Sequence, residues 1–242
     1  MANTTYQLLE PGAKELLYAR KYVWQLPIRL CHWVNVLAIT TLFATGLYIS
    51  SPILAPNGEA WQHFVMGRVR QIHFISGYVL LFSFLVRIYW FYVGNNYARS
   101  GFPFVWRRAW WADLREQAMQ YLRLDRGHVH LGHNALAGLS YPIFVICLGW
   151  FQILTGLALY SESNPGGFWN KLLGWIIPLF GGSFRLHMWH HTVAWSFVAF
   201  LILHMYIVLY DDRQFKNGLI SSMVVGLKFY EKKDLDHDRW LS

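Results

Sequence analysis

The fold of this chain is decided by residues 187–210, which read HMWHHTVAWSFVAFLILHMYIVLY. From Thr192 to Tyr210 the segment has no Asp, Glu, Lys or Arg. At about 1.5 Å of rise per residue, it is long enough to cross about 30 Å of hydrocarbon. Histidines lie near both ends of the apolar run, and ionisable side chains are costly inside a membrane. We therefore expect a transmembrane helix whose histidines have specific partners.

Three further apolar runs bring the number of predicted spans to four. They cover about 33–50, 74–93 and 135–160, and Arg87 is the only full charge inside any of the four. Hydrophobic residues make up 55% of the 242-residue chain and charged residues only 14%, which is too apolar for an ordinary soluble domain. We predict an all-α membrane protein, a four-helix bundle that forms one domain over residues 1–242 with a tail at 211–242.

Two shorter apolar segments accompany the spans. Residues 174–180 contain Pro178 and are followed by two glycines, so this segment is expected to lie at a membrane interface. Residues 219–230 are apolar for about two turns and then basic, which predicts a surface helix or a partner contact.

The basic residues are distributed unevenly among the connecting segments. Sixteen lie before the first span, between the second and third, or after the fourth, whereas the other two connections hold four, which are Arg68, Arg70, Lys171 and Arg185. Because the segments richest in Lys and Arg remain in the cytoplasm, both termini are expected to be cytoplasmic. This topology accounts for the formal charge of +8, and nucleic-acid binding is not expected.

Four histidines lie at matched depths in these spans. His32 lies at the cytoplasmic start of the first span, and His73 and His190 lie at the outer starts of the second and fourth. His204 lies deeper in the fourth span, toward its cytoplasmic end. Two imidazoles at one depth can fill both axial positions of a haem iron.

The fourth span allows a geometric test of which histidines could serve two stacked haems. At about 100° per residue, the 14 residues from His190 to His204 return to within about 40° of the starting direction. Starting from His191 or His187 leaves about 140° or about 100°. His190 is therefore the better partner of His204 on one helix face, about 21 Å away along the axis. His187 remains a second candidate.

Depth then pairs His32 with His204 on the cytoplasmic side and His73 with His190 on the outer side. Each pair would hold one haem b, because the chain has no C-x-x-C-H motif for covalent attachment of a c-type haem. An iron with two histidine ligands has no open position, so we expect electron transfer and not oxygen chemistry. An alternative interpretation of the H-x-x-H-H spacing at 187–191 is a surface zinc site.

Three arginines are candidate partners for the haem propionates. Arg29 and Arg70 each precede a proposed ligand by three residues, so that guanidinium and imidazole share a helix face. Arg87 lies 14 residues beyond His73, near the depth of the cytoplasmic haem. The alternative role for these side chains is to extend to the lipid headgroups.

Small and polar residues near the spans have expected structural roles. Gly46 and Gly77 permit close approach of a macrocycle or of another helix. Asn134 is expected to cap the third helix, with His133 making an interfacial hydrogen bond.

The order of these motifs resembles the cytochrome b subunit of membrane-bound nickel-iron hydrogenases. The strings that carry the resemblance span residues 22–230 and include PIRLCHWVN, TGLYI, RQIHFISGY, RIYWFYVGNNYAR, TGLALYSE, HMWHH and HMYIVLYDD. The resemblance implies a multi-pass protein of the bacterial inner membrane and of the respiratory chain. It also implies that the family's four ligands to two haems b correspond to His32, His73, His190 and His204.

This resemblance implies a subunit that is not an enzyme on its own. It would be the membrane anchor and electron-transfer subunit of a hydrogen:quinone oxidoreductase, with the small and large hydrogenase subunits as partners on the outer side. Electrons from the small subunit's iron-sulfur clusters would pass the outer haem and then the cytoplasmic haem to menaquinone or ubiquinone in the membrane lipid. The alternatives are a formate dehydrogenase cytochrome and a stand-alone cytochrome that oxidises superoxide or quinol.

Overall fold

The computed structural model describes residues 5–7, 17–53, 63–102, 105–122 and 132–231, and four of its helical segments are long and apolar enough to cross a membrane. Three of these segments are the single helices α1 (Leu26–Ser50), α2 (Val65–Val93) and α9 (Ser183–Phe215). The remaining segment is built from α5 (Ala135–Tyr141), a π-helical stretch η1 (Pro142–Gly149) and α6 (Trp150–Ser161). The four predicted spans and the helical fold class are confirmed.

The helices begin earlier than the apolar runs from which they were predicted. α1 starts at Leu26, α2 at Val65 and α9 at Ser183, within segments that are too polar to count as hydrocarbon-spanning. Backbone hydrogen bonding continues through such interfacial turns, because a helix does not need apolar side chains where it meets water or headgroups. As a result, His73 and His190 lie more than one turn inside their helices and have helical neighbours on both sides.

The third span widens at its centre. Pro142 has no amide hydrogen and cannot donate the usual helical hydrogen bond, and the wider π-helical turns begin at this residue. The helix recovers its ordinary pitch at Trp150 and continues to Ser161.

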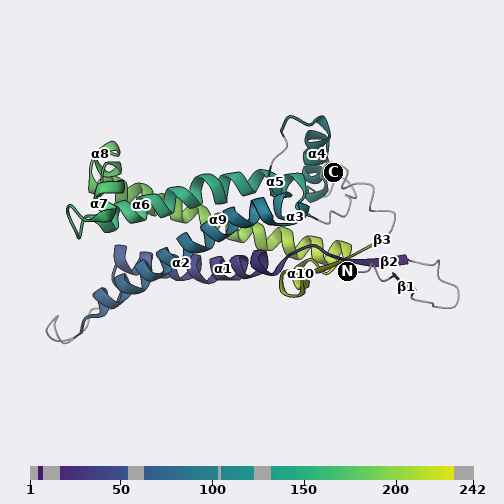
Figure 1. Cartoon of the computed structure of the whole chain (residues 1–242), viewed down its shortest axis with the longest axis horizontal. Helices are drawn as coiled ribbons and strands as arrows, with labels where there is room; N and C mark the ends of the chain where they lie inside the picture. The colour runs from purple at the N-terminus through teal and green to yellow at the C-terminus, as the bar shows by residue number, and fades with distance from the viewer. Residues whose placement is uncertain (1–4, 8–16, 54–62, 103–104, 123–131, 232–242) are drawn as a thin grey trace. The chain divides into compact units, whose positions relative to one another are not determined.

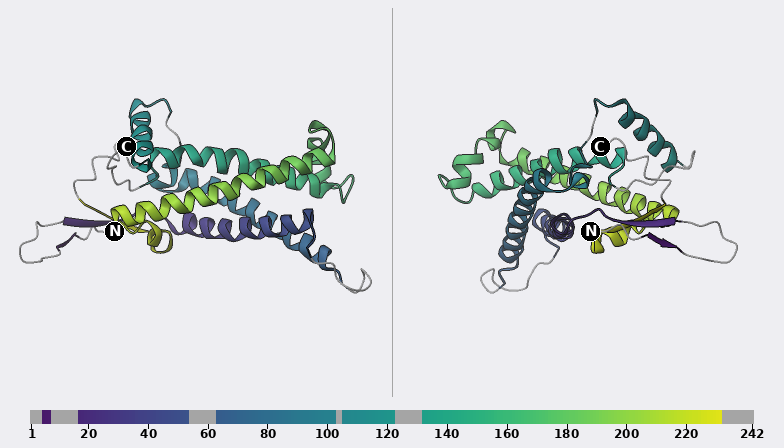
Figure 2. Two further views of the ribbon diagram at one scale, coloured as in Figure 1. Left: turned by 180° about the vertical axis from the view of Figure 1, so that it is seen from behind. Right: turned by 45° about the vertical axis from the view of Figure 1, so that its right-hand side comes forward.

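Close packing divides the chain into two units. The first unit comprises Met1–Leu30, Ile88–Ile146 and Phe200–Ser242, and the second comprises Cys31–Arg87 and Cys147–Ala199. In the second unit, the segments of α1 and α2 lie side by side, and α6 lies beside the first part of α9 (Figures 1 and 2). Two short helices, α7 (Phe168–Leu173) and α8 (Ile176–Leu179), pack against α6. Of the segment 174–180, which was expected to lie at an interface, residues Ile176–Leu179 form α8.

The first unit contains a small sheet that the sequence did not predict. Strands β1 (Thr5–Gln7), β2 (Leu17–Tyr22) and β3 (Leu227–Glu231) pair antiparallel in the order β1-β2-β3. The surface helix expected over 219–230 is α10 only from Leu219 to Val225, because Gly226 takes a left-handed conformation (φ 83°) that ends the helix and turns the chain into β3.

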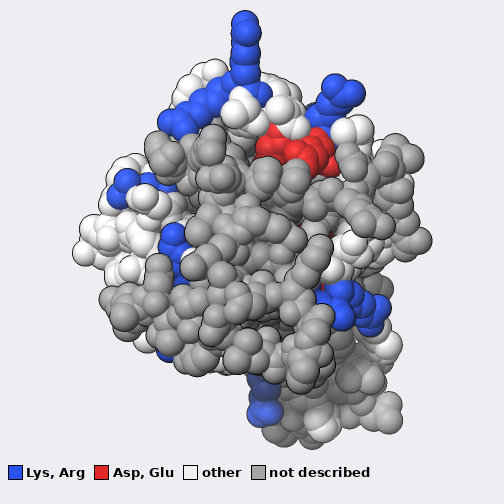
Figure 3. Space-filling view, turned by 90° about the vertical axis from the view of Figure 1, so that its right-hand side faces the viewer, with Lys and Arg blue, Asp and Glu red and all other residues white. Residues whose placement is uncertain are grey.

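The first unit also holds α3 (Asn96–Arg99) and α4 (Arg108–Tyr121). Figure 3 views the end of the chain at which α4, α10 and the strands lie, and it shows lysine and arginine side chains spread around one compact acidic area. The described basic residues of this unit include Arg99, Arg107, Arg108, Arg115, Arg213, Lys216 and Lys228. This concentration of basic residues agrees with the charge asymmetry seen in the sequence.

Candidate functional site

His73 of α2 packs against a Thr-Gly step of α1. Its Nδ1 lies 2.9 Å from the Oγ1 of Thr45. A Cβ added to Gly46 would lie 3.4 Å from the Cε1 of His73, so the edge of the imidazole rests on glycine backbone. The ring is half-buried between the two helices, and its position is set by these two neighbours.

His190 of α9 packs against a Thr-Gly step of α6 in the same way. Its Nδ1 lies 2.8 Å from the Oγ1 of Thr155, which is buried. A Cβ added to Gly156 would lie 3.2 Å from the Cε1 of His190. The two proposed outer ligands therefore share one type of environment, a threonine hydroxyl at Nδ1 and a glycine at the ring edge.

The two imidazoles also lie near one another within the second unit. His190 interacts electrostatically with His73 of α2, as well as with its α9 neighbours His187 and His191. That the two histidines bind one haem, as their depth in the sequence suggested, stays a prediction.

The neighbouring histidines of α9 are engaged differently. The Nδ1 of His187 lies 3.0 Å from the Ser183 carbonyl oxygen of its own helix. The Nε2 of His191 accepts a hydrogen bond of 3.3 Å from the indole N–H of Trp195, also on α9. Within the described residues, no three His, Cys, Asp or Glu side chains are placed to hold a metal ion together, which disfavours the zinc alternative.

The proposed cytoplasmic ligands lie in different units, and each has an aromatic neighbour. His204, in the first unit, stacks on Phe200 with ring centroids 5.5 Å apart and an interplanar angle of 26°. Phe200 in turn stacks on Phe144 of η1 at 4.3 Å. His32, in the second unit, is half-buried and meets Trp33 edge to face at 5.1 Å. Their pairing remains a prediction.

The three candidate arginines have different surroundings. Arg29 donates from Nη1 to the carbonyl oxygen of Val224, at the end of α10. Arg87 is buried in α2, with 9% of its surface exposed. Arg70 is exposed and lines a cavity of about 340 Å³. Their roles toward haem propionates remain predictions.

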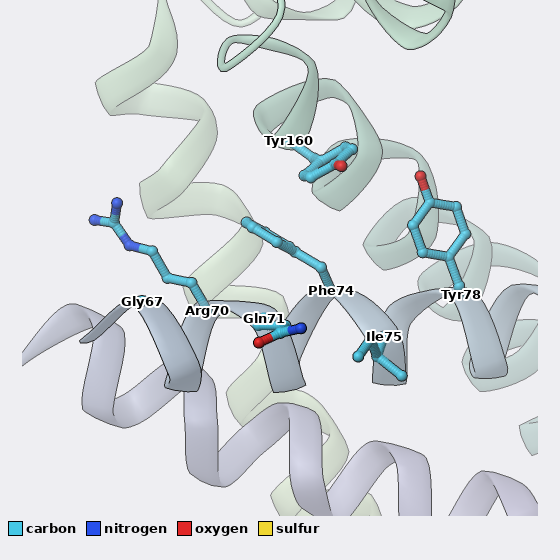
Figure 4. A pocket seen from close by; sticks show the side chains of 7 residues that line it. All are labelled: Gly67, Arg70, Gln71, Phe74, Ile75, Tyr78 and Tyr160. Carbon is cyan, nitrogen blue, oxygen red and sulfur yellow. The ribbon is translucent and has the colours of Figure 1, made fainter. Parts of the chain in front are cut away.

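The cavity beside Arg70 is aromatic. Figure 4 shows Phe74 and Tyr78 rising from α2 on the side where Tyr160 of α6 lies, while the side chain of Arg70 extends away from Tyr160. Phe74 meets Tyr160 edge to face at 4.6 Å, and the hydroxyl of Tyr78 accepts a 2.7 Å hydrogen bond from the indole N–H of Trp169. An apolar wall with one cation at its rim suits a macrocycle that is apolar in its ring and anionic at its edge.

A polar network in the first unit joins α4, α5 and α9. Asn134 caps α5 as predicted, accepting from the amide of Ala137 at 2.8 Å. Its side-chain amide donates to the Tyr121 hydroxyl, which donates to Oδ2 of Asp211 at 2.7 Å. Burial and the Asp211 carboxylate raise the pKa of Tyr121 far above its ordinary value of 10.0. His133 makes its expected polar contact, with Nδ1 2.9 Å from the Ser100 hydroxyl.

The second unit fits a haem held by two histidines. His73 and His190 are close together, and both have their Nδ1 atoms against threonine hydroxyls. Gly77, one turn beyond His73 on α2, has no atom within 4 Å of where its Cβ would be, so the surface there has room for a flat group. The threonines were missed by sequence reasoning, although both lie in the strings TGLYI and TGLALYSE, which share the triplet Thr-Gly-Leu.

Comparison with known proteins gives consistent results. The sequence profile of the family described as prokaryotic cytochrome b561 matches residues 23–226. A probable Ni/Fe-hydrogenase B-type cytochrome subunit of Azotobacter chroococcum is 41% identical over 213 residues, covering 87% of this chain and 89% of the relative. A protein of the same description from Cupriavidus necator is 38% identical, covering 87% of each chain. The probable Ni/Fe-hydrogenase 1 B-type cytochrome subunit of Escherichia coli K12 is 36% identical, covering 87% of this chain and 91% of the relative. These matches confirm the resemblance seen in the sequence motifs.

Proposed function

Because this chain belongs to the prokaryotic cytochrome b561 family, we propose that it carries electrons from a nickel-iron hydrogenase to membrane quinone, using two haems b held by histidine pairs. The chain is a hydrogenase-associated b-type cytochrome with four helices able to cross a membrane. Beyond this, we propose that there are two haems, which residues bind them, in which direction electrons move, and that quinone is the acceptor.

The single observation that carries the proposal is the matched setting of His73 and His190. Two imidazoles from different helices lie near one another, each with Nδ1 against a threonine hydroxyl. Haem b, when bound, supplies a one-electron couple at its iron. Two histidine ligands leave that iron no open position, which favours electron transfer over oxygen chemistry.

His32 and His204 are proposed as the ligands of the second haem. They lie on α1 and α9, and the 14 residues between His190 and His204 on one continuous helix correspond to about 21 Å along its axis. With both termini cytoplasmic, this haem lies on the cytoplasmic side, nearer the proposed site of quinone reduction. Arg29, Arg70 and Arg87 are proposed to contact the propionates.

The partners follow from the orientation and from the relatives' names. The hydrogenase small and large subunits would lie on the outer side of the bacterial inner membrane, next to the haem of His73 and His190. Around the start of α9 the side chains of Phe184, Met188 and Trp189 are exposed, which suits lipid or an apolar segment of a partner subunit.

The test uses the complete hydrogenase complex in membranes, with hydrogen as the reductant. With His204→Ala, hydrogen should still reduce the outer haem, while hydrogen-dependent quinone reduction stops. With His73→Ala, both should stop, because the first acceptor is lost. Full quinone reduction by the His204→Ala complex would contradict the proposed route, and reduction by formate instead of hydrogen would favour the formate dehydrogenase alternative.

A further inference from the structure

Each proposed outer ligand rests on the same triplet in the preceding long helical segment. Residues 45–47 of α1 and 155–157 of α6 both read Thr-Gly-Leu, and they receive His73 and His190 respectively. We propose that Thr45 and Thr155 are positioning residues that fix both imidazoles as the Nδ1–H tautomer, with Nε2 left to bind iron. This inference rests on the proposed function, because it assigns roles around the same haem.

The direction of the hydrogen bond at His73 follows from a count of hydrogens. The Thr45 Oγ1 lies 2.6 Å from the carbonyl oxygen of Thr41 and 3.2 Å from that of Leu42. A carbonyl can only accept, so the single hydroxyl hydrogen of Thr45 points to its own helix. Only lone pairs of Oγ1 then remain for His73, and its Nδ1 must carry the hydrogen and donate.

The same count holds at His190. The Thr155 Oγ1 lies 2.6 Å from the carbonyl oxygen of Phe151 and 3.3 Å from that of Gln152. Its hydroxyl hydrogen is therefore committed within α6, and the Nδ1 of His190 donates to Oγ1 at 2.8 Å. Two helix pairs that share no residues reach one arrangement, which would be an unexpected coincidence for packing alone.

This arrangement prepares both rings for a metal. An imidazole whose Nδ1 donates a hydrogen bond presents the lone pair of Nε2, and the bond also fixes the rotation of the ring. A donated hydrogen bond makes the ligand more basic, which stabilises ferric over ferrous iron and lowers the midpoint potential.

The two glycines set how closely the imidazoles approach the neighbouring helix backbone. There is less space at Gly156 of α6 than at Gly46 of α1. An added Cβ would lie 3.2 Å from His190 at Gly156 but 3.4 Å from His73 at Gly46. Substitutions at Thr155 and Gly156 should therefore have larger effects than those at Thr45 and Gly46.

The test compares Thr45→Val and Thr155→Val with Thr45→Ser and Thr155→Ser in the purified complex. Valine keeps the shape and removes the acceptor, whereas serine keeps the hydroxyl. Thr192→Val is the matched control, because its hydroxyl donates to the Met188 carbonyl on α9 and has no imidazole contact in the described residues. The readouts are a redox titration of both haems, the low-spin electron paramagnetic resonance signal, and haem transfer to apomyoglobin.

The valine variants should raise the midpoint potential of the outer haem and weaken its retention by about 10- to 100-fold, more at Thr155 than at Thr45. The serine variants should restore both the potential and the retention. The cytoplasmic haem should be unchanged throughout, which also reports that the chain is folded. Valine variants that match Thr192→Val in potential, signal and retention would overturn the inference and leave the proposed function standing. A wild-type complex without an outer haem would overturn both.

Discussion

The proposed outer ligands and His204 are supported by different means. In the second unit, His73 and His190 each have a threonine hydroxyl at Nδ1. In the first unit, as far as the structure describes it, His204 stacks flat on Phe200. A hydrogen bond fixes both the rotation of a ring and the position of its hydrogen, whereas a stack fixes only its plane. The outer ligands are thus more completely oriented by protein than His204 is.

The largest effect that bears on this comparison is loss of a whole haem. His32→Ala and His204→Ala should each remove the same haem, because each takes away one of two axial ligands at one iron. The double variant should lose no more haem than either single variant. Haem quantification with redox titration checks this, and single variants that remove different haems would contradict the pairing.

Much of the fold could be predicted from apolar runs, whereas the side chains that hold the proposed ligand histidines in place could not. The runs located the four spans, and helix geometry selected His190, the α9 histidine whose Nδ1 contacts another helix. The sheet was missed because β2 and β3 lie more than 200 residues apart in sequence, where no local pattern connects them. The threonines were missed because a Thr45 to His73 contact depends on how two helices pack.

A second prediction concerns the partly buried hydrogen-bond network of Tyr121, Asn134 and Asp211 in the first unit. Tyr121→Phe removes the hydroxyl that joins Asn134 to Asp211, leaving both with one partner fewer. Thermal denaturation of the purified protein should show a loss of about 1–3 kcal/mol. An unchanged melting temperature would show that the network contributes nothing to stability.

The same tyrosine predicts a pH dependence. Its pKa is raised in the folded chain, so above pH 10 the unfolded chain loses a proton that the folded chain keeps. This group's contribution to stability is therefore full below pH 10 and falls as the pH rises further. Melting curves between pH 9 and about 11 should fall less steeply for Tyr121→Phe than for the wild type. An equally steep fall for Tyr121→Phe and the wild type would contradict a raised pKa of Tyr121 in the folded chain.

A smaller effect is expected when Phe200, on which His204 stacks, is changed. Phe200→Leu keeps most of the volume but removes the flat ring beneath His204, at a cost of about 0.5–1.5 kcal/mol. The cytoplasmic haem should be retained less well and show a broader low-spin resonance, while the outer haem is unchanged. Val193→Leu, on the same helix, serves as a control for general packing changes. Equal effects on both haems would contradict separate support of the two sites.

The central claim is that His73 and His190 hold one haem between them. The most direct measurement is the haem content per chain of His190→Ala, with His187→Ala and His191→Ala as matched controls on the same turns of α9. We expect two haems in the wild type and in both controls, and one haem in His190→Ala. The haem that His190→Ala loses should have the same midpoint potential as the haem that His73→Ala loses. Retention of two haems by His190→Ala, or loss of one by His187→Ala, would contradict it.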